Sequence, residues 1–437
     1  MIFIVSLLFM GCSGDGSVDG EAPEAAPIEQ LVEVSSEQPA AETEGGDLSA
    51  PVSPDDLAGL PAPILPINLG RISYPLDITS DISLARQALL EVVQSETSDP
   101  TNPWAIAHGL VALGSEMRLS NGELAIDYLF SEYAEEVSHG DNVLVTFPAS
   151  GETEDGGLVR IEPHTDLIVK ALIETDVRLD RQVVVAGNPH QVGELWLETV
   201  LTSHLNMSDG SSSWEGTDDM AWGLQAIAAF APEGMTWSSG GVQMSLDEMS
   251  ELTAHVLTSE SMFLLEAMQS NSGFTKEGQG IFAYTCGGAH LLQTASYLTA
   301  RGFGGVAAQQ KLQAQVDLLF YRFPRELAIY DTAVAAAPTQ ELIITVQRLK
   351  FIGHWIESAY KMAATGLFEP SVAQQSAMAE AVGLLVDTVA KLKSLGALDN
   401  LADIRSENEQ LYLDIVGDSA HAVRGLDLAL GLGEVRY

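Results

Sequence analysis

The chain has few basic residues. Its 437 residues include 20 Lys and Arg against 61 Asp and Glu, which gives a formal net charge of -41 at pH 7. Nucleic acids and anionic lipid surfaces are recognised through clusters of Lys and Arg, so we expect neither as a partner. A surface dominated by carboxylates favours solubility, and we expect a monomer.

Cysteine is almost absent. Only Cys12 and Cys286 occur, and Cys286 is the single cysteine in the body of the chain, residues 71–437. The body therefore has no internal disulfide and depends on apolar burial for stability, for which it is long enough. The C-x-x-C and H-E-x-x-H patterns of familiar zinc sites are also missing.

The N-terminal segment is typical of an export signal. Residues 1–11 are almost wholly apolar, end at a Gly-Cys junction, and are too short to span a membrane. This junction resembles that of bacterial lipoprotein signal peptides, which implies that Cys12 becomes a lipidated N-terminus anchored in the membrane. Ser13 after it favours the outer membrane over the inner membrane.

The next segment is predicted to be a disordered tether. Residues 13–70 contain no Lys or Arg and are rich in Glu, Asp, Pro, Ala, Ser and Gly. Such a composition cannot bury enough apolar surface to offset the entropy lost on ordering. We therefore divide the chain into a signal peptide (1–11), a tether that carries lipidated Cys12 (12–70) and one helical domain (71–437).

Apolar periodicity predicts an all-α body with a few short β-hairpins. Ser245 and Glu248 have the spacing of a capping box ahead of one helix. Strands are predicted over 143–147, 158–161, 182–186 and 242–244, the first two flanking one Gly-rich turn. Amphipathic helices are predicted over 83–95, 123–137, 246–268, 307–321, 341–364 and 371–395.

A weak internal repeat runs through the same region. Six segments carry a His, Trp or Cys and then become small and apolar, at intervals of 56 to 68 residues. This length suits one αα-hairpin plus a loop, so we predict an α/α toroid of six αα-hairpins around a central cavity. The alternative is a helical domain without repeats, in which the marked residues are scattered. In the toroid, the first turns of the inner helices converge, and these residues face the cavity: His108, His164, Asp166, Trp222, Cys286, His290, His354 and His421.

The stretch Cys286-Gly-Gly-Ala-His290 is a candidate metal or thiol site. On a helix, residues four apart share a face, and thiolate with imidazole is a zinc ligand pair. In the toroid, this pair can be completed by His164, His108, His354, Asp218 or Asp219. If the two glycines break the helix, Cys286 lies at a helix N-terminus, where its thiolate is favoured and His290 serves as base. Alternatively, Cys286 packs as a small apolar side chain.

Acidic loop residues offer a second kind of chemistry. The candidate acid and base groups of a glycan hydrolase are Glu162, Asp166, Glu215, Asp218, Asp219 and Glu277, among which no single pair stands out. Tyr284 with His164 is a candidate pair for a lyase. The alternative is that such residues cap helix N-termini or are solvated charges.

Five phrases carry a family resemblance. They are N-P-W-A-I-A-H-G-L, I-E-P-H-T-D-L-I-V-K-A-L, G-Q-G-I-F-A-Y-T-C-G-G-A-H-L-L-Q, R-L-K-F-I-G-H-W and G-D-S-A-H-A-V-R-G-L, within residues 100–425. Together they resemble an uncharacterised family of secreted lipoproteins from myxobacteria-like organisms, which implies no specific activity. The predicted fold is also similar to terpenoid-cyclase-like and lanthionine-cyclase-like toroids. The latter hold zinc with two Cys and one His, to which Cys286 and His290 correspond.

These observations predict a lipid-anchored protein of the bacterial cell envelope whose central cavity binds a carbohydrate or small molecule. The alternative is a hydrolase or lyase that acts on glycan or peptidoglycan-like material, with zinc as a candidate cofactor. The sequence favours neither a particular substrate nor a particular reaction.

Overall fold

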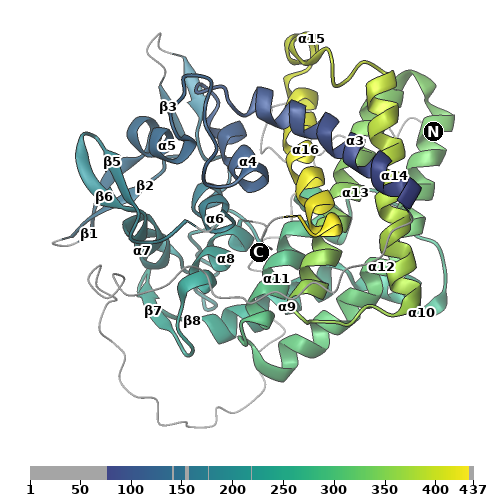
Figure 1. The fold of residues 1–437 in the computed structure, drawn as a ribbon. Coiled ribbons are helices and arrows are strands. Elements are labelled where there is room, and N and C mark those ends of the chain that lie inside the picture. Colours follow the sequence, from purple (N-terminus) through teal and green to yellow (C-terminus); the bar gives the residue numbers. More distant parts are fainter. Residues whose placement is uncertain (1–75, 140–141, 153–156, 176, 218, 433–437) are drawn as a thin grey trace.

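A computed structural model of the chain describes residues 76–139, 142–152, 157–175, 177–217 and 219–432. Within these residues it is mostly helical, with fourteen α-helices and four two-stranded antiparallel hairpins (Figure 1). This confirms the predicted all-α class with short hairpins. The predicted signal peptide (1–11), lipidated Cys12 and tether (12–70) lie outside the described residues and stay predictions.

Six helices are buried over much of their surface. Every residue of α6 and α8 is buried, as expected for helices without a polar face. Each of the six packs against the next along the chain, and the last, α16, packs back against the first, α4. They are α4 (Pro103–Leu113), α6 (Leu167–Ile173), α8 (Met220–Phe230), α11 (Ala289–Ala300), α13 (Glu341–Ala364) and α16 (Glu409–Leu430).

The other helices pack outside these six. On α14 the buried residues Met378, Val382, Leu385 and Val389 recur at helical spacing and make the single apolar face that meets α13. α3 packs on α16, α5 on α4, α7 on α8, α9 and α12 on α11, α10 on α12, and α15 on α16. Their bounds are α3 (Leu76–Glu96), α5 (Ala125–Tyr133), α7 (Val192–Thr202), α9 (Leu246–Glu260), α10 (Met262–Ser270), α12 (Gly305–Ala336), α14 (Val372–Ser394) and α15 (Leu401–Glu407).

The hairpins decorate one part of the helical body. The first three lie near α5 and α7, on the left of Figure 1, away from α12 to α14. The pairs are β1 (Glu135–His139) with β2 (Asn142–Thr146), β3 (Ser150–Glu152) with β4 (Leu158–Arg160), β5 (Gln182–Val185) with β6 (Asn188–Gln191), and β7 (Thr236–Ser239) with β8 (Val242–Ser245). The two strands predicted around one turn, 143–147 and 158–161, thus belong to different hairpins.

Some predicted boundaries were wrong. The helix predicted over 123–137 ends at Tyr133, because residues from Glu135 onward pair with β2 as a strand. The one predicted over 246–268 is divided at Ser261, whose φ of -94° and ψ of 4° interrupt the helix. Ser245 does precede α9, but its side chain makes no capping hydrogen bond. The prediction over 341–364 coincides with α13.

Glycine allows α13 and α16 to approach closely. A Cβ added at Gly353 would lie 3.2 Å from both Cα and Cβ of Ala422, closer than ordinary van der Waals contact. Gly425 in turn lies against the backbone of Gly353 and Glu357. The two helices therefore meet backbone to backbone, which brings side chains on either flank of this contact together.

Among the described helices, none combines the length and apolar character that crossing a bilayer requires.

Candidate functional site

Four imidazoles from four of the six buried helices lie together. The ring centroids of His354 on α13 and His421 on α16 are 4.0 Å apart, and His290 on α11 lies 5.0 and 5.2 Å from them. His108 on α4 lies 5.9 Å from His421. His290, His354 and His421 are at most 5% exposed. Residues far apart in the sequence thus form one buried histidine cluster.

Aromatic contacts connect this cluster to the loop before α6. Trp222 on α8 lies 4.2 Å from His290, and its other neighbour is His164, stacked at 5.6 Å. Nδ1 of His164 lies 3.1 Å from a carboxylate oxygen of Asp219. The structure therefore places most of the predicted cavity residues in one contiguous group.

The predicted placement in first helical turns is wrong for three of them, since His108 is the sixth residue of α4 and lies in its second turn. His354 and His421 lie in the middle of α13 and α16, which are 24 and 22 residues long, whereas α4 and α8 have 11 residues each. Each residue adds 1.5 Å to a helix, so α13 and α16 are about twice as long as α4 and α8. Equal spacing in the sequence therefore does not place residues in the same turn of each helix.

His354 is a buried polar side chain whose hydrogen-bonding capacity is unused. Neither ring nitrogen has a hydrogen-bond partner among the described residues, and the side chain is 2% exposed. Nδ1 lies 4.0 Å from Glu357 Oε2 and Nε2 lies 3.8 Å from Asp418 Oδ1, both too far for a hydrogen bond. Burial, reinforced by the charge of His421, holds the pKa of His354 well below its ordinary value. The ring is therefore neutral at pH 7 and has a free lone pair.

His290 is likewise buried, with one ring nitrogen unbonded within the described part of the chain. Its Nδ1 has no hydrogen-bond partner, and burial together with His354 and Lys170 lowers its pKa well below the ordinary value. Most buried polar atoms in proteins are bonded, so two neighbouring imidazoles with unused nitrogens make this cluster a candidate binding site.

Glu357 is the carboxylate at the centre of the cluster. Its Oε2 accepts a hydrogen bond from His421 Nδ1 at 2.8 Å, and its Oε1 pairs with Lys361 Nζ, also at 2.8 Å. Burial alone would raise the pKa of Glu357, but Lys361 and His421 outweigh it and hold the pKa well below the ordinary value. The side chain is thus an ionised carboxylate in an interior site.

A second layer of polar side chains supports this carboxylate. Lys361 Nζ also lies 2.8 Å from Glu174 Oε1 and 2.9 Å from Gln293 Oε1, and Glu174 pairs with Lys170 at 3.0 Å. The sequence analysis missed Glu357, Lys361 and Glu174. His354, Glu357 and Lys361 are spaced by three and four residues, which puts them on one face of α13, and this spacing was the available signal.

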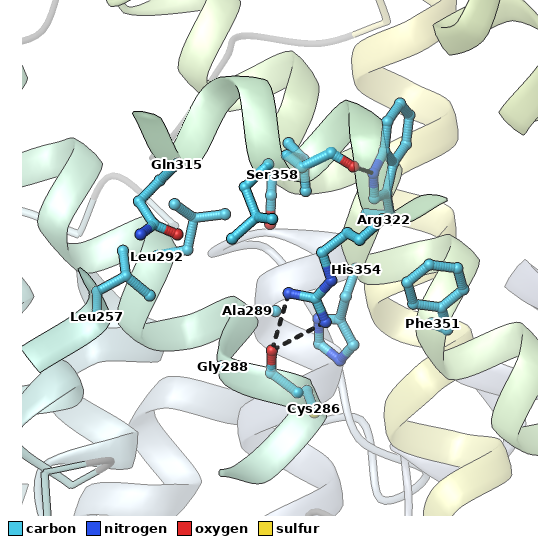
Figure 2. A pocket seen from close by; sticks show the side chains of 14 residues that line it. Leu257, Cys286, Gly288, Ala289, Leu292, Gln315, Arg322, Phe351, His354 and Ser358 are labelled. Atoms are coloured by element: carbon cyan, nitrogen blue, oxygen red, sulfur yellow. Dashed lines mark hydrogen bonds between the residues drawn. The ribbon is translucent and has the colours of Figure 1, made fainter. Parts of the chain in front are cut away.

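A small cavity adjoins His354. Its volume is about 30 Å³, enough for one ion or water molecule. Figure 2 shows His354, Ser358 and the turn at Cys286 around it, with the Arg322 guanidinium 3.4 Å from the carbonyl oxygen of Gly287. The cavity is too small for a sugar ring.

Cys286 lies in a left-handed turn rather than on a helix. Its φ is 53°, and Gly287 and Gly288 follow with φ of 62° and 74°, so α11 begins only at Ala289. The shared helical face predicted for Cys286 and His290 is therefore wrong, and the alternative of a break at the glycines is observed. A left-handed cysteine costs about 1–3 kcal/mol, and such strain often occurs at functional sites.

The Cys286 side chain is nonetheless close to two imidazoles. The donor atoms of Cys286, His290 and His354 lie within 4.8 Å of one another, a grouping that can hold a metal ion. No cysteine among the described residues is free, so we assign no role to a Cys286 thiolate. His164, predicted as a third ligand, instead lies against Asp219 and Trp222.

Three carboxyl groups near α6 have raised pKa values. Burial raises the pKa of Asp166 to about 7, although Thr199 donates a hydrogen bond to it at 2.9 Å. Burial and Asp166 raise the pKa of Glu198 to about 7, and they raise that of Glu162 well above the ordinary value. Asp166 also has a left-handed backbone, with φ of 68°. Carboxyls that hold protons near neutral pH are suited to general acid catalysis.

The remaining catalytic candidates are Tyr284, Asp219 and Asp218. Tyr284 is 5% exposed, and its hydroxyl oxygen accepts a hydrogen bond from Thr217 at 2.8 Å. Asp219 is held by His164. Asp218 lies outside the described residues, so its role stays a prediction.

Comparison with models of protein families, with curated proteins and with solved structures finds no match for the chain. The family resemblance inferred from its phrases therefore stays a prediction.

Proposed function

We propose that this protein is a lipid-anchored protein of the bacterial envelope, exposed at the outer membrane, whose helical body is an α/α toroid that binds a small ligand at its centre. The contacts of the six inner helices support the toroid, because each packs on the next and α16 packs on α4. The apolar segment 1–11 and Cys12 support the anchor.

The observation that carries the binding function is that His354 is buried while neither of its ring nitrogens is hydrogen-bonded within the described part of the chain. A fully buried imidazole with two unused nitrogens destabilises the protein unless it interacts with something else. Because the adjoining cavity holds about one ion or water molecule, the ligand at this position is of ionic size. This observation favours binding of an ion over the carbohydrate predicted from the sequence.

The experiment measures thermal unfolding of the full chain with separate panels of divalent cations, inorganic anions and short glycans. At least one ion raises the unfolding midpoint of the wild type, because a ligand that binds only the folded state stabilises it. Replacing His354 by Leu removes this shift, whereas His255→Asn on α9, outside the histidine cluster, retains it. If no ligand shifts the midpoint, or if the shift survives in the His354→Leu variant, this function is wrong.

A second candidate function is a hydrolase or lyase that acts on a glycan or peptidoglycan-like substrate. The raised pKa values of Asp166 and Glu198, both about 7, favour it, because a general acid must hold its proton at the working pH. Assays on peptidoglycan should then show activity that falls at least about 100-fold in Asp166→Asn or Glu198→Gln. Absence of activity in the wild type eliminates this candidate.

A further inference from the structure

We propose that the ligand of the buried histidine cluster is a divalent transition-metal ion bound by His354, Glu357 and His421. This inference rests on the proposed binding function and specifies its ligand. One donor atom from each residue lies within 4.8 Å of the others, and the three side chains are at most 6% exposed. Two imidazole nitrogens and a carboxylate oxygen form a donor set that zinc-binding sites commonly use.

The donor separations suit one ion after a small adjustment. Metal–ligand distances of about 2.0–2.2 Å place two donors of the same ion roughly 3–4 Å apart. Nδ1 of His354 lies 4.0 Å from Glu357 Oε2, and Nδ1 of His421 lies 2.8 Å from the same oxygen. The second distance is that of a hydrogen bond, so the ion takes the place of the hydrogen on His421 Nδ1, and the neutral ring then carries its hydrogen on Nε2.

The same ion gives His354 the partner that it lacks. No hydrogen-bond donor or acceptor lies within reach of Nδ1, although the ring is enclosed on all sides. Nδ1 therefore needs a partner that fits the gap of 4.0 Å to Glu357 Oε2, which is too long for a hydrogen bond. An ion bridging the two side chains meets this condition and leaves the rest of the cluster in place.

The side chains around Glu357 hold its carboxylate in the orientation that a ligand needs. Its second oxygen stays paired with Lys361, which Glu174 and Gln293 hold in turn. Outer partners of this kind orient ligands and are commonly needed for full metal affinity.

This set differs from the zinc ligands predicted from the sequence. Those were Cys286 and His290 with a third ligand from His164, His108, His354, Asp218 or Asp219, and the structure groups Cys286 and His290 with His354. His354 belongs to both groupings, so its replacement alone does not discriminate between them. His421 and Cys286 do, because each belongs to only one.

The test uses the full chain, stripped of metal with a chelator and titrated with Co²⁺ and then Zn²⁺. Co²⁺ reports nitrogen and oxygen ligands through its visible absorption, and calorimetry gives the stoichiometry. The wild type binds one ion per chain and gains roughly 2–8 °C in its unfolding midpoint. Affinity falls at least about 10-fold in His354→Leu, His421→Asn and Glu357→Gln.

Matched variants separate the alternatives. Cys286→Ala and His255→Asn retain the ion if the assignment is right. Circular dichroism and metal-free unfolding show that each variant is folded, and His421→Asn keeps a side chain that can donate to Glu357. Binding that survives in His421→Asn but is lost in Cys286→Ala overturns the ligand assignment.

The experiments distinguish an error in the metal assignment from an error in the proposed binding function. If the wild type binds neither Co²⁺ nor Zn²⁺, but an anion or glycan raises its unfolding midpoint in a way that depends on His354, the metal is wrong and the binding function stands. If no ligand of any class binds, both are wrong.

Discussion

Nδ1 of His421 donates a hydrogen bond to Oε2 of Glu357 across 2.8 Å, and both side chains are buried. An ionised carboxylate only accepts hydrogen bonds, so Nδ1 carries the hydrogen. The bond joins α16 to α13 at the level where the two helices approach most closely. The same hydrogen bond therefore belongs both to the contact between α13 and α16 and to the histidine cluster.

Glu357→Gln should destabilise the folded state by about 3–5 kcal/mol, because it leaves buried Lys361 without one of its two carboxylate partners. The measurement is chemical denaturation of the metal-free chain. The matched control is Glu341→Gln on the same helix, whose pair with Lys391 is partly exposed and should be worth at most about 1 kcal/mol. Equal losses in the two variants would contradict a special role for the buried network.

Gly353→Ala should destabilise the protein by about 1–3 kcal/mol, because the added Cβ lies 3.2 Å from Ala422 and forces α13 away from α16. Gly383→Ala on α14 is the control, since no atom lies within 4 Å of its added Cβ. That change should stabilise by about 0.4–1 kcal/mol through lower entropy of the unfolded chain. A stabilised Gly353→Ala variant would show that the two helices are not in tight contact.

Ser371→Ala should cost about 0.5–2 kcal/mol, because Ser371 caps α14 and accepts a hydrogen bond from the Gln374 backbone at 3.3 Å. Ser245→Ala should cost little, because Ser245 makes no such bond at the start of α9. Thermal unfolding of both variants checks the contrast, and a larger loss at Ser245 would reverse it.

The helical class could be predicted from apolar periodicity, since α13 and α14 bury regular faces against their neighbours. The gathering of His108, His290, His354 and His421 followed from the spacing of similar segments. Predicted helix boundaries were wrong where tertiary contacts determine the secondary structure. An example is Glu135, which begins a strand because it pairs with β2.

The rest of the site could not be predicted from the sequence, because it depends on how deeply side chains are buried and on contacts between residues far apart in the chain. Glu357 and Lys361 look like an ordinary exposed helical pair, and only the fold shows that both are fully buried. The left-handed backbone of Cys286 follows from the two glycines after it, yet the group that its side chain faces is set by α13, more than 60 residues further along the chain.

Asp166→Asn should change how stability depends on pH. Burial raises the pKa of Asp166 to about 7 in the folded state, whereas an unfolded aspartate titrates near pH 4. Between these values the folded chain holds one more proton than the unfolded chain. The contribution of Asp166 is therefore fully present below about pH 4, and it is lost, at about 1.4 kcal/mol per pH unit, as the pH rises to about 7.

The Asp166→Asn variant lacks this loss, so its stability relative to the wild type should rise steadily from pH 4 to pH 7. The amide that replaces the carboxyl group keeps an oxygen that accepts the hydrogen bond from Thr199, which limits other effects. Thr199→Val provides a second check: the hydrogen bond lowers the pKa of Asp166, so removing it should extend the loss to higher pH. Denaturation at half-unit pH steps measures all three chains, and parallel profiles between pH 4 and 7 would show that Asp166 does not hold its proton in the folded protein.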